Sequence, residues 1–432
     1  MKTRKITALA AALILALSAA SCGNSGDASA PYINQPAAAA QAADIEPAAS
    51  KTSFEKSDSK VSDAFRKSAA DFSAELLKKS ALSDIKAGKN AFISPESVMM
   101  ALGLAANGAG GDTLTQFLDM FGCKNMEEVN TALSALMSSA ASNEQLGIAN
   151  SIWVRDRDIT LKQDYAEICK RRLDAESFLA PFSSETLAAL NGWVNTKTKG
   201  MIPAIKDSFS EDEVAVLINC TTFEALWNDP YTNNPEDDKF TAASGDKQDC
   251  KMLYSTEHTY IGDDQASGFL KYYDGSHYAF AALLPNEGVS ISDYADSLTG
   301  EKLLKLFGEP SYDYTVRASI PEFKFDWGKS IAEAVSEMGL DKAFMPSADF
   351  SNMAETSTGL LYIGDVIHKT HIELDRSGTK AAAATEIEMK CGAALIDEEK
   401  IKRVYLDRPF IFAIIDLETS LPVFMGAVNS IE

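Results

Sequence analysis

The strongest constraint on the fold is a change of pattern near Val214, inside a long stretch that contains no linker. Before that point, apolar residues recur at helical spacing in 61–79, 95–108, 126–140, 162–172 and 184–199. After it, short β-branched or aromatic segments bounded by turns cover 214–223, 278–285, 314–323, 361–374, 409–416 and 422–429. Helices followed by strands, with no internal repeat over 61–432, predict one α+β domain with a mixed or antiparallel sheet.

Short local signals locate the starts of two helices. Ser94 precedes Pro95, and serine suits the capping position whereas proline suits the first turn. Asn107-Gly108 is typical of the end of the same helix. Asp112 is expected to cap the next helix.

The first residues predict an export signal. Three basic residues within the first five precede an apolar run from Ile6 to Ala20, which is too short to span a bilayer comfortably. The small residues before Cys22 resemble the lipobox of bacterial lipoproteins. This resemblance implies that residues 1–21 are a signal peptide and that lipidated Cys22 anchors the mature chain to a bacterial membrane at the cell surface. Ordinary secretion into the extracellular space is the alternative.

Residues 22–60 are predicted to form a flexible tether. They are rich in alanine and proline and contain few large apolar residues. Such a composition cannot bury enough surface to offset the entropy lost on ordering. The folded domain is therefore expected to cover residues 61–432.

The charge of the chain excludes two classes of partner. It carries 40 basic and 62 acidic residues, a formal net charge of −22. Nucleic acid and anionic lipid both require a positive surface, so neither is expected to bind, and membrane contact is expected only through the lipid anchor. Acidity of this size favours a soluble monomer.

The sequence contains no motif for catalysis or for a metal site. G-x-S-x-G, H-E-x-x-H, the P-loop and the dinucleotide-binding glycine pattern are all absent. The five cysteines after Cys22 are odd in number and irregularly spaced, which predicts free thiols. His368 and His371 are expected on opposite faces of the strand 361–374, so they are not expected to share a metal. An enzyme is not indicated, and no metal or cofactor is expected.

The segment Thr379–Lys390, TKAAAATEIEMK, has a pattern of its own. Its alternate residues form one small-to-apolar face, which consists of Thr379, Ala381, Ala383, Thr385, Ile387 and Met389. The other face is polar wherever it is not alanine, as in a half-buried strand. The segment is nevertheless followed along the chain by small residues and then by charged ones. The pattern therefore indicates a conditional strand, with an alanine-rich helix or a surface loop as the alternatives.

Motifs spread over residues 61–432 resemble those of the serpin family. In chain order they are Asn90–Ser97, Asn191-x-Trp193-Val194, Thr198-x-Gly200-x-Ile202, Leu217-x-Asn219, Pro321-x-Phe323, Ala348–Ser351, His368-Lys369, Gly378-Thr379 with Ala381–Ala384, Arg408–Phe410 and Phe424–Gly426. Each motif is weak alone, but the complete series in order is specific.

This resemblance implies the serpin fold, with helices, a large central β-sheet, two smaller sheets and an exposed reactive centre loop at about residues 376–406. It also implies a protease inhibitor rather than an enzyme. In an inhibitory serpin, a serine protease attacks a scissile bond in this loop and forms an acyl-enzyme. The cut loop then inserts into the central sheet as a new strand and distorts the protease.

The resemblance assigns a hinge to Gly378, Thr379, Lys380, Ala381, Ala382, Ala383, Ala384 and Thr385. A hinge enters a sheet only where its side chains are small, and Thr379 and Ala381–Ala384 meet this condition. The hinge therefore favours an inhibitor over a non-inhibitory serpin that serves as a binding or carrier module. Arg376 and Lys380 depart from the glutamates that are usual there. Arg376 is expected to lose an ion pair at the base of the loop, and both side chains are expected to face solvent.

The family spacing, counted from Gly378, places the scissile residue at Gly392, followed by Ala393. The loop is longer than is common, so Met389, Lys390 and Cys391 stay open. Lys390 implies a trypsin-like target. Cys391 or a small neighbour implies an elastase-like target, because such pockets admit only small side chains, and we favour this reading. Inhibition of papain-like cysteine proteases is a further alternative.

Five residues match positions at which the central sheet of a serpin opens. Ser94, Ser97, Asn219 and His368 match the shutter, where a polar network is expected to break and reform during insertion. Trp227 matches the region in which insertion starts. A plain helix cap for Ser94, and ordinary core positions for His368 and Trp227, are the alternatives.

Overall fold

The computed structural model describes residues 45–431 except 158, 212, 358–360 and 380–397. Its α-helices are α1 (Asp63–Leu76), α2 (Leu82–Lys86), α3 (Pro95–Gly108), α4 (Gly111–Phe121), α5 (Met126–Ala140), α6 (Gln163–Leu173), α7 (Ser184–Lys197), α8 (Ile291–Ser297), α9 (Gly300–Gly308) and α10 (Ala332–Val335). Within this part of the chain, no helix combines the length and the apolar character needed to cross a bilayer.

The strands alternate with these helices in the first half and dominate the second half. They are β1 (Ala91–Ile93), β2 (Leu146–Arg155), β3 (Ile159–Leu161), β4 (Glu176–Ala180), β5 (Ala215–Phe223), β6 (Ala225–Leu226), β7 (Glu236–Thr241), β8 (Lys247–Glu257), β9 (Tyr260–Gly262), β10 (Ala266–Tyr272), β11 (Tyr278–Pro285), β12 (Thr315–Pro321), β13 (Phe323–Ser330), β14 (Ala354–Thr356), β15 (Ile367–Leu374), β16 (Gly378–Thr379), β17 (Ile401–Tyr405), β18 (Phe410–Asp416) and β19 (Leu421–Val428).

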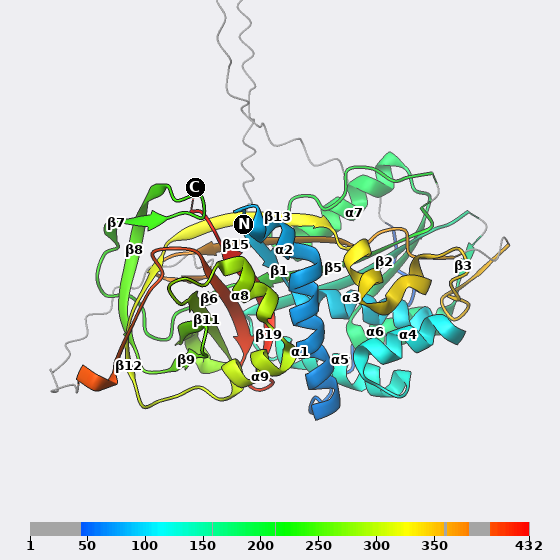
Figure 1. Ribbon diagram of the computed structural model, residues 1–432. Helices are drawn as coiled ribbons and strands as arrows, with labels where there is room; N and C mark the ends of the chain where they lie inside the picture. The colour runs from blue at the N-terminus through cyan, green and yellow to red at the C-terminus, as the bar shows by residue number, and fades with distance from the viewer. Residues whose placement is uncertain (1–44, 158, 212, 358–360, 380–397, 432) are drawn as a thin grey trace, which may run out of the picture. The chain divides into compact units, whose positions relative to one another are not determined.

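The strands form several sheets. One sheet has the order β1-β19-β18-β11-β10-β9, and another has the order β17-β12-β8-β7. Two further groups, β4-β2-β5 and β13-β15-β16-β6, lie next to each other with β5 beside β15 (Figure 1). We call these two groups together the split sheet. An α+β fold is thus confirmed, and β11, β18 and β19 are buried along their whole length, which is why they consist of apolar runs without alternation.

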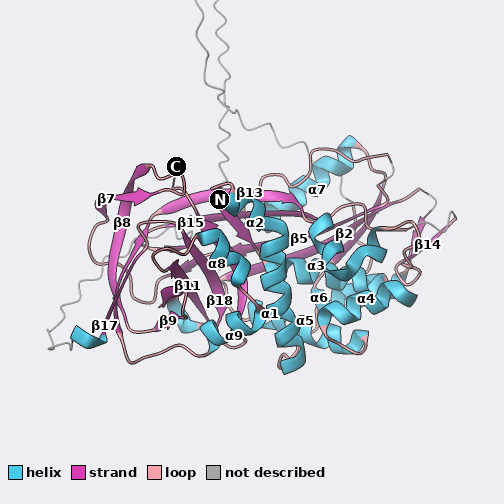
Figure 2. Ribbon diagram, viewed as in Figure 1, coloured by secondary structure: helices cyan, strands magenta, loops and turns pink. Residues whose placement is uncertain are grey.

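Helices cover both faces of the split sheet. On one face, α3 packs against β5. On the other face, α7 packs Leu190 and Val194 against Trp153 and Val216 of the strands. Figure 2 shows α7 above these strands and α3, α4, α5 and α6 below them. The split sheet is therefore a central layer, and any widening of it has to be accommodated by both helical layers.

The helices predicted over 126–140, 162–172 and 184–199 are confirmed as α5, α6 and α7. The prediction that Asp112 caps α4 is wrong, because the helix begins at Gly111, after Gly110. Asp112 lies in the first turn, where the helix dipole also favours a carboxylate, and its Oδ2 is 2.6 Å from Lys342 Nζ. Four of the predicted free thiols lie in the described residues and are confirmed, namely Cys123, Cys169, Cys220 and Cys250.

Part of the segment predicted as a tether contacts the folded domain. The Ala48 N–H donates to the carbonyl of Ser177 on β4, at 2.6 Å, and Phe54 packs against the main core. Ile45 packs against the cluster beneath α7. Ile45 and Phe54 are thus partly buried, and the edge of β4 satisfies part of the backbone between them. Residues 45–54 therefore contact the domain that was predicted to cover residues 61–432, whereas residues 22–44 lie outside the described residues.

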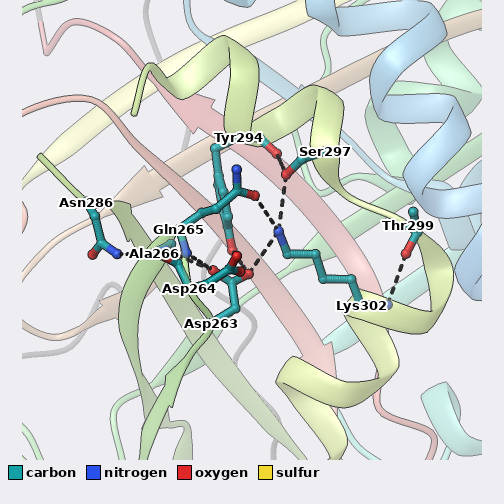
Figure 3. A network of polar contacts seen from close by, with 9 residues as sticks. All are labelled: Asp263, Asp264, Gln265, Ala266, Asn286, Tyr294, Ser297, Thr299 and Lys302. Carbon is teal, nitrogen blue, oxygen red and sulfur yellow. Dashed lines mark hydrogen bonds and ion pairs between the residues drawn. The ribbon is translucent and has the colours of Figure 1, made fainter. Parts of the chain in front are cut away.

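A polar network joins the turn between β9 and β10 to α8 and α9 (Figure 3). Lys302 Nζ lies 2.9 Å from Asp263 Oδ2 and 3.1 Å from both Gln265 Oε1 and Ser297 Oγ. The same ammonium group lies 4.6 Å from the centre of the Tyr294 ring, and the Tyr294 hydroxyl donates to Asp263 at 3.1 Å. Lys302 therefore connects the β9–β10 hairpin to α8 and α9 through these contacts.

Candidate functional site

The candidate site is the gap between β5 and β15. β5 pairs with β2, and β15 pairs with β13 along its whole length. Among the described residues, β5 and β15 do not pair with each other, and β15 meets β16 only at Leu374. Two facing strand edges without partners can accept an extended segment between them. The two edges already lie side by side, so an extended segment can pair with both of them only after β5 and β15 move apart.

The short strand β16 already occupies one end of this gap. Thr379 pairs with Leu374 of β15 on one side and with Ala225 of β6 on the other, and Gly378 pairs with Leu226. A Cβ atom on Gly378 would lie 2.0 Å from the Ala225 carbonyl oxygen, so only glycine permits this close approach. The first two residues of the predicted hinge are therefore already paired as a strand within the split sheet.

A tight turn leads from β15 into β16. The Asp375 carboxylate accepts hydrogen bonds from the backbone N–H groups of Ser377, at 2.6 Å, and Gly378, at 3.2 Å. Trp227 holds the same turn, because its backbone N–H donates to the Ser377 carbonyl at 3.0 Å and its Nε1–H donates to the Asp375 carbonyl at 3.1 Å. Trp227 thus contacts the turn directly before the predicted hinge, and its assigned role at the start of insertion stays a prediction.

The side chain of Thr379 points into an aromatic cluster. It is 3% exposed, and its Oγ1 lies 2.6 Å from the hydroxyl oxygen of the fully buried Tyr273. The Tyr273 ring stacks on Trp227, with ring centres 4.6 Å apart, and meets Phe223 edge-on at 4.8 Å. Thr379 is therefore fixed by side-chain contacts as well as by backbone pairing.

Arg376, at the base of the loop, has polar partners and is half-buried, which differs from the expected solvent-facing side chain. Its guanidinium donates to Asn234 Oδ1 at 3.0 Å, and its backbone N–H donates to Glu322 Oε1 at 3.3 Å. Burial raises the pKa of Glu322, and the hydrogen bond and charge of Arg376 oppose this rise. The hydrogen bond to this carboxylate comes from the backbone of Arg376, whereas the guanidinium donates to a neutral amide.

The four residues assigned to the shutter lie together and connect both edges of the gap. The Ser94 N–H donates to His368 Nε2 on β15 at 2.9 Å, and the Ser94 hydroxyl donates to the Val423 carbonyl at 2.8 Å. The same hydroxyl accepts the Ser97 N–H at 3.3 Å, as expected for a helix cap. Ser97 donates in turn to Asn219 Oδ1 on β5. The start of α3 therefore links β15 to β5 through hydrogen bonds that a widening gap has to break.

The protonation state of His368 follows from these contacts. Burial lowers its pKa to about 4, so the ring is neutral near pH 7. Because Nε2 accepts a hydrogen bond, the proton of the neutral ring lies on Nδ1. His371 lies on the opposite face of β15, as expected, with its Nδ1 2.5 Å from Asp326 Oδ1.

Two residues of the site were not found from the sequence. Asn150 on β2 is buried, accepts from Asn219 Nδ2 at 2.6 Å, and donates to the Leu173 carbonyl at 2.7 Å, which extends the shutter network. Its only signal is an asparagine inside the apolar segment of β2. Tyr273 gives no signal, because a tyrosine in an aromatic-rich segment is typical of a protein core.

The remaining predicted site residues lie outside the described residues. They are Cys22, Lys380, Ala381, Ala382, Ala383, Ala384, Thr385, Met389, Lys390, Cys391, Gly392 and Ala393. Their assigned roles stay predictions.

Comparison with known proteins identifies the family. The family model described as serpin (serine protease inhibitor) matches residues 67–431. Serpin-ZX of Arabidopsis thaliana is 26% identical over 374 residues, which cover 82% of this chain and 95% of the relative. Leukocyte elastase inhibitor A of Mus musculus is 28% identical over 362 residues, which cover 79% of this chain and 93% of the relative.

A solved structure gives the same result. The crystal structure of the thermophilic serpin Tengpin in its native state has a TM-score of 0.83 and 37% identity, and the match covers 89% of this chain and 99% of that one. The latent state of Tengpin gives a lower TM-score, 0.75, so the described fold resembles the native form more closely. The chain belongs to the serpin family. Its members are usually serine protease inhibitors rather than enzymes.

Proposed function

We propose that this protein is a suicide-substrate inhibitor of serine proteases with an elastase-like target. The observation that carries the proposal is the hinge at one end of an unfilled gap, where Thr379 already pairs with strands on both sides. A cut loop that continues from Thr379 along this gap gains hydrogen bonds to the free edges of β5 and β15. This gain is the driving force that the mechanism requires.

The chemical step is the ordinary first half of proteolysis. The hydroxyl oxygen of the protease serine attacks the carbonyl carbon of the scissile residue and forms an ester. The peptide bond breaks, and the new amino group, which takes up a proton, begins the C-terminal fragment. Insertion of the loop then carries the ester-linked protease along and distorts its active site before water hydrolyses the ester.

The target class follows from the loop sequence. Gly392, with Ala393 after it, is the first assignment of the scissile residue, and Met389, Lys390 and Cys391 are the alternatives. Small side chains suit the shallow pocket of an elastase-like protease.

We also propose that lipidated Cys22 holds the monomeric protein at an extracellular bacterial surface, where it meets foreign proteases.

The test mixes the protein, residues 45–432, separately with pancreatic elastase, neutrophil elastase and trypsin. Denaturing gels reveal a covalent complex of summed mass, and mass spectrometry of the released peptide locates the cut. Two loop variants provide matched controls. Ala383 shares the inward face of Thr379 by strand alternation, so Ala383→Arg should abolish the complex, whereas Ala382→Arg on the outward face should retain it.

The outcomes distinguish an inhibitory serpin from a non-inhibitory one. A covalent band for the unchanged protein and for Ala382→Arg, but simple cleavage of Ala383→Arg, supports trapping by insertion. Cleavage without a covalent band for every protease tried contradicts the proposal and favours a non-inhibitory binding or carrier serpin. A band with trypsin alone moves the scissile residue to Lys390.

A further inference from the structure

Tyr273 places a hydroxyl group in a site that is otherwise aromatic. Its ring is fully buried between Trp227, at an angle of 13°, and Phe223, at 69°. Among the described residues, the hydroxyl has one hydrogen-bond partner, Thr379 Oγ1 at 2.6 Å. Burial raises the pKa of Tyr273 far above its ordinary value, so the phenol stays neutral. A buried hydroxyl is costly without a partner, so this contact stabilises the position of Thr379.

The partner residue is the first hinge residue with a side chain. Thr379 pairs with Leu374 on one side and Ala225 on the other, which is the register that a longer inserted strand would keep. Its bond to Tyr273 therefore exists before the loop is cut and need not break afterwards. The rest of the hinge can extend from a residue that is already seated.

The position of Tyr273 is itself fixed by the surrounding strands. Its backbone N–H donates to the Tyr278 carbonyl at 3.1 Å, and it forms an isolated bridge with Trp227. Trp227 also binds the turn that precedes the hinge, through the Ser377 and Asp375 carbonyls. The hydroxyl is thus presented to Thr379 from a rigid support.

We infer that Tyr273 is a positioning residue that holds Thr379 in the split sheet before cleavage and so gives loop insertion its starting point. The inference rests on the proposed inhibitory function. After cleavage, insertion competes with hydrolysis of the acyl-enzyme ester. If Thr379 is already in place, insertion begins with the next residue. If it is not, the first pairing has to form while water attacks the ester.

The test uses two substitutions that each remove one of the two hydroxyl groups. Tyr273→Phe keeps the ring, Thr379→Val keeps a β-branched side chain, and the two are combined in a double variant. Thr379→Ser keeps the hydroxyl and should behave as the unchanged protein. Tyr272→Phe is the matched control, because that hydroxyl contacts Thr259 Oγ1, at 3.2 Å, and not the hinge.

The first readout is the number of inhibitor molecules consumed per protease trapped. The excess above one should rise about fivefold in Tyr273→Phe and in Thr379→Val, the scale expected for one lost hydrogen bond. The double variant should show no further rise, because both substitutions remove the same bond. Unchanged stoichiometry in the single variants, or additive effects in the double variant, overturns the inference.

The second readout needs no protease. Amide hydrogen exchange of residues 375–379 should be about fivefold faster in Tyr273→Phe and unchanged in Tyr272→Phe. If the unchanged protein traps no protease, the proposed function fails, and this readout alone decides whether Tyr273 holds the hinge. Faster exchange with unchanged stoichiometry overturns the link to insertion. Equal exchange in all variants overturns the inference altogether.

Discussion

His368 is a buried histidine whose neutral form the native structure requires. Its Nε2 accepts the Ser94 N–H, and burial lowers its pKa from 6.5 to about 4. The unfolded chain therefore binds more protons than the native one between these two values. The free energy of unfolding should accordingly fall as the pH is lowered from about 6.5 to 4, by about 3 kcal/mol for this residue.

His368→Gln tests this prediction, because the glutamine carbonyl can still accept the Ser94 N–H but does not titrate. Unfolding midpoints are measured from pH 7 to pH 4 for both proteins. Burial raises the pKa of Glu96 to about 8, so Glu96 stabilises the native protein increasingly as the pH falls toward 4.5. His368 and Glu96 change the stability of the native protein with pH in opposite directions. The difference between the pH profiles of the unchanged protein and His368→Gln therefore isolates the contribution of His368. Parallel pH profiles would show that the histidine is not the sensitive group.

At the scale of elements, the Lys302 network is what fixes the β9–β10 turn to α8 and α9. Lys302→Met keeps the aliphatic stem but leaves Asp263 without its ammonium partner. We expect a loss of about 1–3 kcal/mol in the free energy of unfolding and faster amide exchange in the turn. Lys305→Met, on the exposed side of the same helix, should change neither quantity. A comparable loss in both variants would assign the effect to the helix rather than to the network.

The elements also show how far the sequence predicts this structure. α5 follows from its apolar spacing, and α3 follows from Ser94 and Pro95. β2 does not, because a strand covered by helices on both faces shows no alternation, and Asn150 interrupts its apolar run. The hinge and shutter residues were found through family motifs. Tyr273 was not, since its role depends on a partner 106 residues away in sequence.

At the scale of the whole molecule, the free edges of β5 and β15 predict a gain of stability on cleavage. A loop that fills the gap adds a row of backbone hydrogen bonds on each side, on the order of 10 kcal/mol in total. Cleavage within 389–394 should therefore raise the thermal midpoint by about 12 °C. Cleaved Ala383→Arg should keep the midpoint of the uncut protein. A cleaved but unstabilised unchanged protein would mean that the gap does not accept the loop.

The free edges of β5 and β15 do not by themselves distinguish one copy of the loop from another. Two bare strand edges recognise backbone, and backbone is the same in every copy of the chain. The protein's own loop has the advantage of attachment at Thr379, which gives it an effective concentration in the millimolar range. A loop from a neighbouring molecule competes only where the protein is crowded to a similar density. The net charge of −22 works against such crowding. Selectivity for the intramolecular partner is thus a matter of local concentration and not of complementary side chains.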